Sequence, residues 1–307
     1  MRLAVIGQSA FGKAVVEAVA DAGKDQIVGV FPPPQKPGAA EDPIVEAARS
    51  RAVPVLMPGR YRSEAAIEAF KSIEPELCVM AYVTDIVPVD MLFYPRLGTI
   101  QYHPSLLPRH RGPSSINWPI IQGETETGLT IFWPDRGLDT GPILLQKLVP
   151  IGPDDTVASL YFNHLFPQGV KAIVESLDLV RSGSAPRIPQ DEGMATYEGW
   201  CKSEDARIDW NRPADDVYNL IRGCNPQPGA HSTYQGKLLR VFDSETRTQP
   251  GKASPGTVLE TTGTGFEVAC AAGSILVKRV QPPDSRKVPA PDYAAATGLK
   301  AGDRLGA

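Results

Sequence analysis

The sequence predicts an α/β protein with a Rossmann-like, mostly parallel sheet, helices on both faces, and a small C-terminal β-barrel that is OB-like. The first observation is the opening of the chain, where a short apolar run, a helix-like segment and a second apolar run follow one another. The second is a change of character from about residue 205, where short apolar runs alternate with glycine-containing turns. A length of 307 residues leaves room for both parts.

The elements of the sheet are predicted from short apolar runs and from the helical spacing between them. The expected strands are residues 2–6, 26–31, 53–56, 77–81, 98–102, 128–133 and 143–148. The expected helices are residues 12–22, 43–51, 64–72 and 156–182. Pro167 and Gly169 should kink or split the last helix, and three consecutive prolines predict a loop at residues 32–38.

A linker is predicted at residues 182–204, because its first part, SGSAPRIPQ, is rich in serine and proline and has no apolar periodicity. We therefore expect a catalytic Rossmann-like domain over residues 1–181 and the barrel domain over residues 205–307. In the barrel domain the apolar pattern predicts one helix and four strands, at residues 214–222, 238–242, 257–260, 266–270 and 274–280.

Composition and charge exclude several classes of protein. Hydrophobic residues make up 42% of the chain, which allows a sizeable core, and the formal net charge of -4 does not favour a nucleic-acid binder. The four cysteines form no CxxC pair, so zinc ribbons and disulfide frameworks are not expected, and free thiols indicate a reducing cytoplasm. The opening run MRLAVIG is too short for a signal peptide or a membrane span. We expect a cytoplasmic protein that does not bind membranes.

The turn after the first strand, from Gly7 to Lys13, nearly matches a phosphate-binding loop. Ala14 stands where that motif needs a hydroxyl to hold Mg²⁺, and Ser9 stands where the dinucleotide motif needs its second glycine. We interpret the segment as a tight strand-to-helix turn that points backbone N–H groups at the carboxyl edge of the sheet.

Two polar segments follow predicted strands. His103 comes directly after one strand and begins a proline-bounded loop that contains Arg111; alone, such a histidine can be structural or catalytic. Asp135 and Asp139 flank a glycine between two apolar runs. Asp135 fits an ordinary acidic turn, whereas Asp139 lies where a carboxylate can be partly buried. The four histidines do not have metal-ligand spacing, so no metal site is expected.

Together these residues resemble the folate-dependent formyltransferase family. The stretch HPSLLPRHRG at residues 103–112 and LDTG at residues 138–141 are similar to two motifs that the family carries in this order. The resemblance covers nearly the whole chain, is closest to the hydrolase domain of 10-formyltetrahydrofolate dehydrogenase, and extends to methionyl-tRNA formyltransferase. It implies that His103 and Asp139 are catalytic, and that the substrate is the folate 10-formyltetrahydrofolate, which serves as formyl donor without a metal.

Gln101 is the position at which the resemblance is incomplete. The transferases carry Asn two residues before the catalytic histidine, and the hydrolase domain carries an aliphatic residue there. Gln101 supplies an amide that is one methylene longer than Asn, so the choice between transfer and hydrolysis stays open. We expect Gln101 either to be catalytic, by helping His103 to stabilise an oxyanion, or to fill the end of the strand.

The resemblance also implies where the pterin ring binds. The ring should lie at the edge of the sheet, where the family holds it largely through backbone groups. The residues expected to bind substrate are Met80, Ala81, Tyr82, Asp85, Leu107, Asp135 and Gly137.

The implied activity is passage of the formyl group to water or a small amine, with release of tetrahydrofolate and without a covalent enzyme intermediate. One alternative is methionyl-tRNA formyltransferase, although the loop at residues 32–43 has one lysine and two acids, which disfavours tRNA binding. A second alternative is a non-catalytic folate-binding protein, which would need neither His103 nor Asp139. No aldehyde dehydrogenase domain follows in this sequence, so we do not expect oxidation of the formyl group to CO₂.

Overall fold

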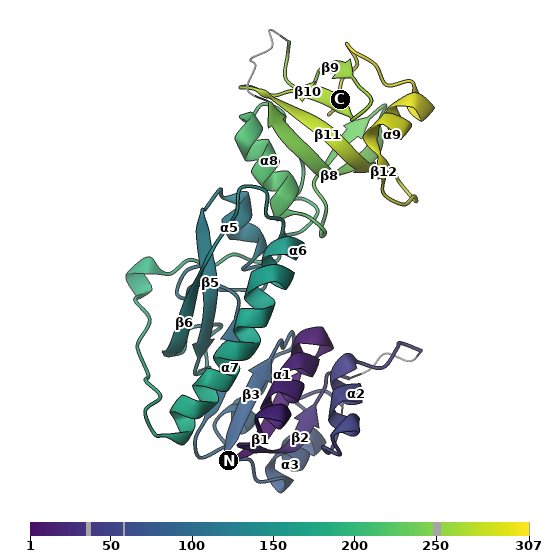
Figure 1. Ribbon diagram of the computed structural model, residues 1–307. Helices are drawn as coiled ribbons and strands as arrows, with labels where there is room; N and C mark the ends of the chain where they lie inside the picture. Colours follow the sequence, from purple (N-terminus) through teal and green to yellow (C-terminus); the bar gives the residue numbers. More distant parts are fainter. Residues whose placement is uncertain (35–37, 58, 248–252, 307) are drawn as a thin grey trace. The chain divides into compact units, whose positions relative to one another are not determined.

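The computed structural model describes residues 1–34, 38–57, 59–247 and 253–306 (Figure 1). The chain divides into two compact units. The first comprises Met1–Ser115, Thr127–Val149 and Phe162–Tyr197; the second comprises Ile116–Glu126, Pro150–Tyr161 and Glu198–Ala307. Among the described residues, no helix is both long enough and apolar enough to cross a membrane.

The first unit is built on a six-stranded sheet with the order β2-β1-β3-β4-β5-β6. The strands are β1 (Arg2–Gly7), β2 (Gln26–Phe31), β3 (Leu77–Ala81), β4 (Thr99–His103), β5 (Glu126–Phe132) and β6 (Ile143–Pro150). The first four run parallel to their neighbours, and β5 runs antiparallel to β4. The expected Rossmann-like sheet is therefore confirmed.

The order of the strands creates a switch point between β1 and β3. β2 lies on the far side of β1, so the chain changes direction across the sheet at this point, and ligands of α/β proteins bind at the carboxyl ends of such strands. Gly7 pairs with Ala81 there. A Cβ atom on Gly7 would lie 2.4 Å from the carbonyl oxygen of Ala81, so the close approach of the two strands requires glycine.

Helices cover both faces of this sheet (Figure 1). On one face, α1 (Ser9–Ala22) packs against α7 (Phe166–Arg181) and α2 (Pro43–Ser50). Phe11 of α1 stacks on Tyr102 of β4, with ring centroids 4.4 Å apart. On the other face, residues of α3 (Glu64–Ser72) and α4 (Val89–Leu92) share one buried cluster with side chains of β1 and β3.

Two local expectations need correction or refinement. The strand expected at residues 53–56 is reduced to a single bridge between Val55 and Val30, because Pro54 has no N–H to continue a ladder. The helix expected at residues 156–182 is split as predicted: α6 (Val157–Leu160) is followed by a wider helical turn, and α7 begins one residue before Pro167.

Gly169 does not break α7. It is buried within the helix, and a Cβ atom on it would lie 2.5 Å from the ring of Tyr102. Its role is therefore close packing of α7 on the sheet. Part of the expected proline loop, residues 35–37, lies outside the described residues.

The second unit contains an antiparallel sheet that curls into a half-barrel, with the order β7-β8-β11-β10-β9, and β12 pairs with β11. The strands are β7 (His231–Tyr234), β8 (Lys237–Arg247), β9 (Val258–Thr261), β10 (Phe266–Ala269), β11 (Ser274–Gln281) and β12 (Val288–Pro289). The helices are α5 (Asn117–Ile121), α8 (Ala214–Gly223) and α9 (Ala290–Thr297), and α5 packs on α8. The sequence pattern missed α5, β7, β12 and α9.

Candidate active site

His103 is the last residue of β4, and its side chain is 5% exposed. Its Nε2 atom lies 2.9 Å from the carbonyl oxygen of His110. A carbonyl oxygen only accepts hydrogen bonds, so Nε2 must carry the hydrogen and donate it. The other ring nitrogen, Nδ1, is therefore the one that can gain or lose a proton.

Asp139 faces this second nitrogen. Its Oδ2 atom lies 3.7 Å from Nδ1 of His103 and accepts a hydrogen bond of 2.9 Å from the backbone N–H of Gly112. The carboxylate is 7% exposed. A distance of 3.7 Å is too long for a direct hydrogen bond, and catalytic pairs are often this far apart before substrate binds. The structure thus brings together the two residues that the sequence selected as catalytic.

The loop of residues 104–112 holds the His110 carbonyl in place. The hydroxyl of Ser105 donates to the carbonyl oxygens of Arg109, at 2.7 Å, and His110, at 3.3 Å. The backbone N–H of His110 donates to Oγ1 of Thr196 at 2.8 Å. The acceptor that fixes the imidazole is therefore itself fixed by two neighbours.

A distant segment, residues 188–197, which we call the strap, runs along this loop. Its Thr196 backbone accepts from the N–H of Arg111 and donates to the carbonyl of Pro108, both at 3.1 Å. These residues fall within the segment expected as a linker, yet they belong to the first unit and hydrogen-bond to the candidate site.

Arg111 connects the loop to the strap. Its guanidinium donates to both carboxylate oxygens of Glu192, at 2.7 and 2.9 Å, and to Oε1 of Gln190. This hydrogen bonding raises the pKa of Arg111 and lowers the pKa of Glu192. Arg111 is buried, so its role here is to order the loop.

Gln190 is a residue of the site that sequence reasoning missed. Its Nε2 group donates to the backbone carbonyls of Asp139, at 2.8 Å, and Gly141, at 2.7 Å. The sequence gives only a weak indication of this role, namely that Gln190 follows Pro189 at the end of the serine- and proline-rich segment. Nothing in that pattern indicates a contact with Asp139, which is 51 residues away along the chain.

Gln101 lies two residues before His103, so strand alternation places both side chains on the same face of β4. In the ladder it is paired with Met80 of β3 and Phe132 of β5. Gln101 is partly exposed, and its side chain forms no hydrogen bond within the described part of the chain. Its catalytic role stays a prediction.

The residues expected to bind the pterin fall into two groups. Met80 and Ala81 are buried at the end of β3, so only their backbone can face a ligand, whereas Tyr82 is 46% exposed with a φ of 61°. Asp85 is exposed, and its carboxylate accepts from the N–H of Ile86. Leu107 is buried, and its backbone N–H and carbonyl are bonded to Thr130 and Gln146.

Asp135 and Gly137 form the second group. Oδ1 of Asp135 accepts from the N–H of Gly137 at 2.9 Å and from the hydroxyl of Thr140 at 2.6 Å. These bonds shape the acidic turn that precedes Asp139. Asp135 therefore has the structural part that its sequence context suggested, and ligand contacts by this turn stay a prediction.

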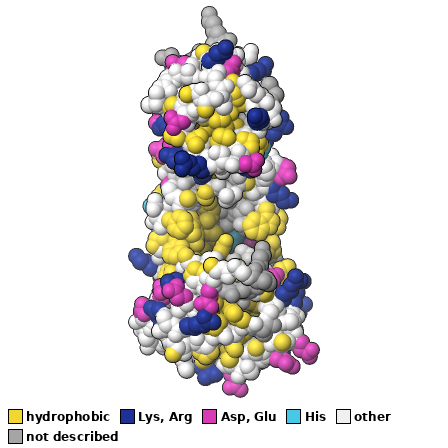
Figure 2. All heavy atoms as spheres, turned by 90° about the vertical axis from the view of Figure 1, so that its right-hand side faces the viewer, with side chains coloured by type: hydrophobic (Ala, Val, Ile, Leu, Met, Phe, Trp, Pro, Cys, Tyr) yellow, Lys and Arg dark blue, Asp and Glu magenta, His cyan; other side chains and the backbone are white. Residues whose placement is uncertain are grey.

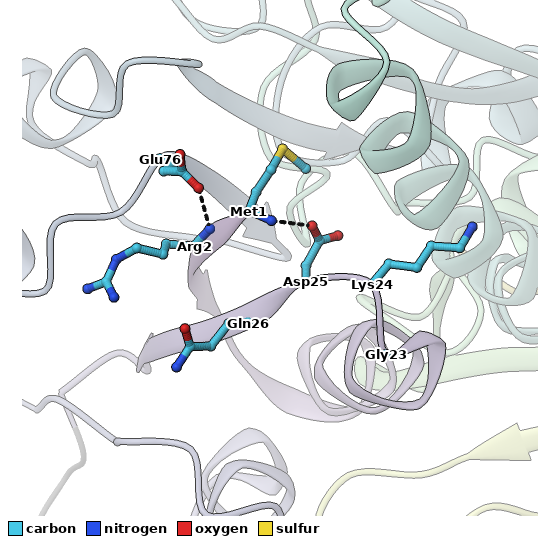
Figure 3. Close-up of a pocket in the computed structure, with 7 residues that line it drawn as sticks. All are labelled: Met1, Arg2, Gly23, Lys24, Asp25, Gln26 and Glu76. Carbon is cyan, nitrogen blue, oxygen red and sulfur yellow. Dashed lines mark hydrogen bonds and ion pairs between the residues drawn. The ribbon is translucent and has the colours of Figure 1, made fainter.

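A separate hollow of about 460 Å³ lies at the amino ends of β1 and β2, at the opposite edge of the sheet from His103 (Figure 3). Its charged groups are engaged by other parts of the protein. The Met1 amine contacts Asp25 at 2.8 Å, and the backbone N–H of Arg2 donates to Glu76. We do not assign the catalytic chemistry to this hollow. In the part of the chain that the structure describes, no group of three His, Cys, Asp or Glu residues is placed to hold a metal.

Fold and site together define an α/β protein with a buried histidine–carboxylate pair at the carboxyl edge of a Rossmann-like sheet. The chain belongs to the formyl transferase family. The family profile described as formyl transferase matches residues 1–177, and that of the formyl transferase C-terminal domain matches residues 201–298. The family expected from the two motifs is confirmed, and membership identifies an enzyme of formyl-group transfer.

Curated relatives include proteins of two kinds. The mitochondrial 10-formyltetrahydrofolate dehydrogenase of Mus musculus is 41% identical over 96% of this chain and 33% of its own length. The chain thus spans about a third of that relative. The methionyl-tRNA formyltransferase of Geotalea uraniireducens is 35% identical over 100% of this chain and 98% of its own length.

Solved structures with the same fold have low sequence identity. HypX from Aquifex aeolicus, in complex with tetrahydrofolic acid, is 19% identical with a TM-score of 0.68, over 98% of this chain and 48% of that one. The sugar 3N-formyl transferase WlaRD is 18% identical with a TM-score of 0.69, over 93% of this chain and 99% of that one. At these identities the likeness concerns the fold.

Proposed function

We propose that this protein takes the formyl group from 10-formyltetrahydrofolate and passes it to water or a small amine, releasing tetrahydrofolate. The observation that carries the proposal is the buried pair of His103 and Asp139, whose facing atoms are 3.7 Å apart. The family, together with relatives named for 10-formyltetrahydrofolate, supports the identity of the formyl donor.

Formyl transfer requires a hydrogen-bond donor to the oxyanion and an acceptor for a proton. Attack on the formyl carbon creates an oxyanion, and a donor aimed at that oxygen contributes about 3–4 kcal/mol. His103, protonated at Nδ1, supplies this donor while Nε2 stays bonded to His110. The carboxylate of Asp139 accepts the proton that the water or amine loses, and that proton then goes to the departing folate nitrogen. No covalent enzyme intermediate is needed.

We propose that the flat pterin ring binds beside the pair. Tyr82 follows directly after β3, whose Met80 pairs with Gln101 of the strand that ends at His103, and Leu138 precedes Asp139. Both side chains are large, apolar and about half exposed. We assign the ring to this edge, with Met80, Ala81, Asp85, Leu107 and the turn of Asp135 and Gly137 as the proposed contacts.

The test is to supply 10-formyltetrahydrofolate without any amine and to measure formate and tetrahydrofolate. Formate released in proportion to the protein concentration would identify a hydrolase. Formyl transfer only after a small amine is added would identify a transferase. If neither formate nor a formylated amine appears in these assays, the proposal is refuted.

A second candidate is methionyl-tRNA formyltransferase, because the relative of that name is matched along nearly its whole length. The charge of the chain disfavours tRNA binding. The net charge is -4, and on the face shown in Figure 2 basic and acidic side chains are interspersed. Incubation with initiator methionyl-tRNA and the same formyl donor would reveal this activity.

We also propose that the protein is cytoplasmic, because all four cysteines are free thiols.

A further inference from the structure

The side chain of Gln190 joins the two halves of the candidate site. Its Nε2 group donates to the carbonyls of Asp139 and Gly141, and its Oε1 atom accepts from Arg111 at 2.8 and 3.2 Å. We infer that Gln190 is a positioning residue, which holds the Asp139 carboxylate against His103 and Gly112 for formyl transfer. This inference rests on the proposed function of the pair.

Asp139 needs such a restraint because its backbone has a φ of 57°, in the left-handed region. That conformation is less favourable than the right-handed region even for aspartate, so contacts that fix the turn stabilise it. The two carbonyls that Gln190 binds lie on either side of Thr140, so one amide clamps the turn that carries the carboxylate. The turn is also tight at Gly141, where a Cβ atom would lie 1.8 Å from the carbonyl oxygen of Trp133.

A competing explanation is that Gln190 only fastens the strap to Arg111. The two roles depend on different atoms of the amide: Nε2 binds the two carbonyls, and Oε1 binds Arg111. Gln190→Glu has nearly the same shape and keeps an acceptor for Arg111, but it cannot donate to the two carbonyls when ionised. Fastening alone therefore predicts that Gln190→Glu is tolerated, whereas positioning of Asp139 predicts that it is not.

The experiment compares wild type, Gln190→Glu and the matched control Gln26→Glu. Gln26 is exposed at the amino end of β2, in the hollow of Figure 3. The readouts are kcat and KM for 10-formyltetrahydrofolate, and hydrogen exchange at the amide of Gly112 by NMR. That amide reports the carboxylate directly, since it donates to Oδ2 of Asp139.

We expect kcat of Gln190→Glu to fall roughly 10- to 100-fold with KM unchanged. A misplaced Asp139 carboxylate stabilises the transition state less, while substrate binding is not affected. The Gly112 amide should exchange faster, and Gln26→Glu should match wild type in both readouts. Unchanged kcat overturns the inference, and so does a loss of kcat with unchanged exchange at Gly112.

Failure of the proposed function gives a different result. If wild type turns over no 10-formyltetrahydrofolate, that function fails, and exchange at Gly112 alone decides whether Gln190 holds Asp139. If Gln190→Glu does not fold, Gln190→Met and Glu192→Gln take its place. Gln190→Met loses both the donor to the two carbonyls and the acceptor for Arg111, whereas Glu192→Gln weakens only the contact with Arg111. The inference then requires faster exchange at Gly112 in Gln190→Met and wild-type exchange in Glu192→Gln, and equal exchange in both variants overturns it.

Discussion

The chemistry of the site depends on which nitrogen of His103 is free. The carbonyl of His110 occupies Nε2, so the ring presents Nδ1 to Asp139. The side chain of His103 is bound on one side and faces a carboxylate on the other, an arrangement that suits a hydrogen-bond donor to the oxyanion. The same ring without its partners would be an ordinary buried histidine.

We expect His103→Ala to abolish turnover and to leave the fold intact. Loss of one oxyanion donor costs about 10²–10³-fold in rate. The fold should survive because the His110 carbonyl keeps the hydroxyl of Ser105 as a donor. A steady-state assay and circular dichroism measure the two effects, with His231→Ala, in the second unit, as the matched control. Activity above about one tenth of wild type would remove His103 from the oxyanion role.

Gln101 allows a sharper test, since it shares a strand face with His103 and has a side chain of intermediate exposure. If its amide donates to the oxyanion, Gln101→Asn should keep or improve turnover. Gln101→Ile should then cost about 1.5–3 kcal/mol, or roughly 10- to 150-fold in rate. Equal turnover of wild type, Asn and Ile would show that Gln101 only fills the end of β4.

At the scale of elements, the sequence predicted the strand that leads to His103 and the turn that carries Asp139. Short apolar runs and turn residues are local signals, and both lie next to these residues in the chain. The strap could not be predicted in this way. Arg111 and Gln190 are 79 residues apart, and the strap has no periodicity that indicates its partner.

The pair of Arg111 and Glu192 should make the strap sensitive to acid. The pKa of Glu192 is lowered from 4.5 in the folded protein, first by the hydrogen bond from Arg111. The stabilisation is therefore fully present above about pH 4.5 and is lost as the pH falls through the lowered pKa. Urea unfolding of wild type and Glu192→Gln should differ slightly at pH 7, because the carboxylate is exposed, and the difference should vanish in acid. A difference that grew in acid would contradict the assigned direction.

At the scale of the molecule, both halves of the fold followed from the sequence, and each is matched by a family profile. The predicted domain boundaries at residues 181 and 205 do not coincide with the limits of the two compact units. Residues 116–126 and 150–161 group with the second unit, and residues up to Tyr197 group with the first. Exchange of short segments between units depends on tertiary packing, which local composition does not encode. The domain boundaries stay a prediction.

The charge of the whole chain bears on the acceptor. Phosphate contacts dominate tRNA affinity and weaken steeply with salt, so a tRNA enzyme needs concentrated basic side chains. This chain carries 31 lysines and arginines against 35 acids, and the loop after β2 has a single lysine. We therefore expect a dissociation constant for initiator tRNA weaker than about 1 μM at physiological salt, as for non-specific binding.

Filter binding at two salt concentrations tests this expectation, with an unrelated tRNA as the control. Weak binding that does not distinguish the two tRNAs would support water or a small amine as the acceptor. Sub-micromolar affinity for initiator tRNA, with a steep loss of affinity as salt rises, would mean that few basic residues suffice when they are placed along the bound strand. Methionyl-tRNA formyltransferase would then become the preferred function, while the chemistry assigned to His103 and Asp139 would stand, because attack on the formyl carbon needs an oxyanion donor and a proton acceptor whichever amine arrives.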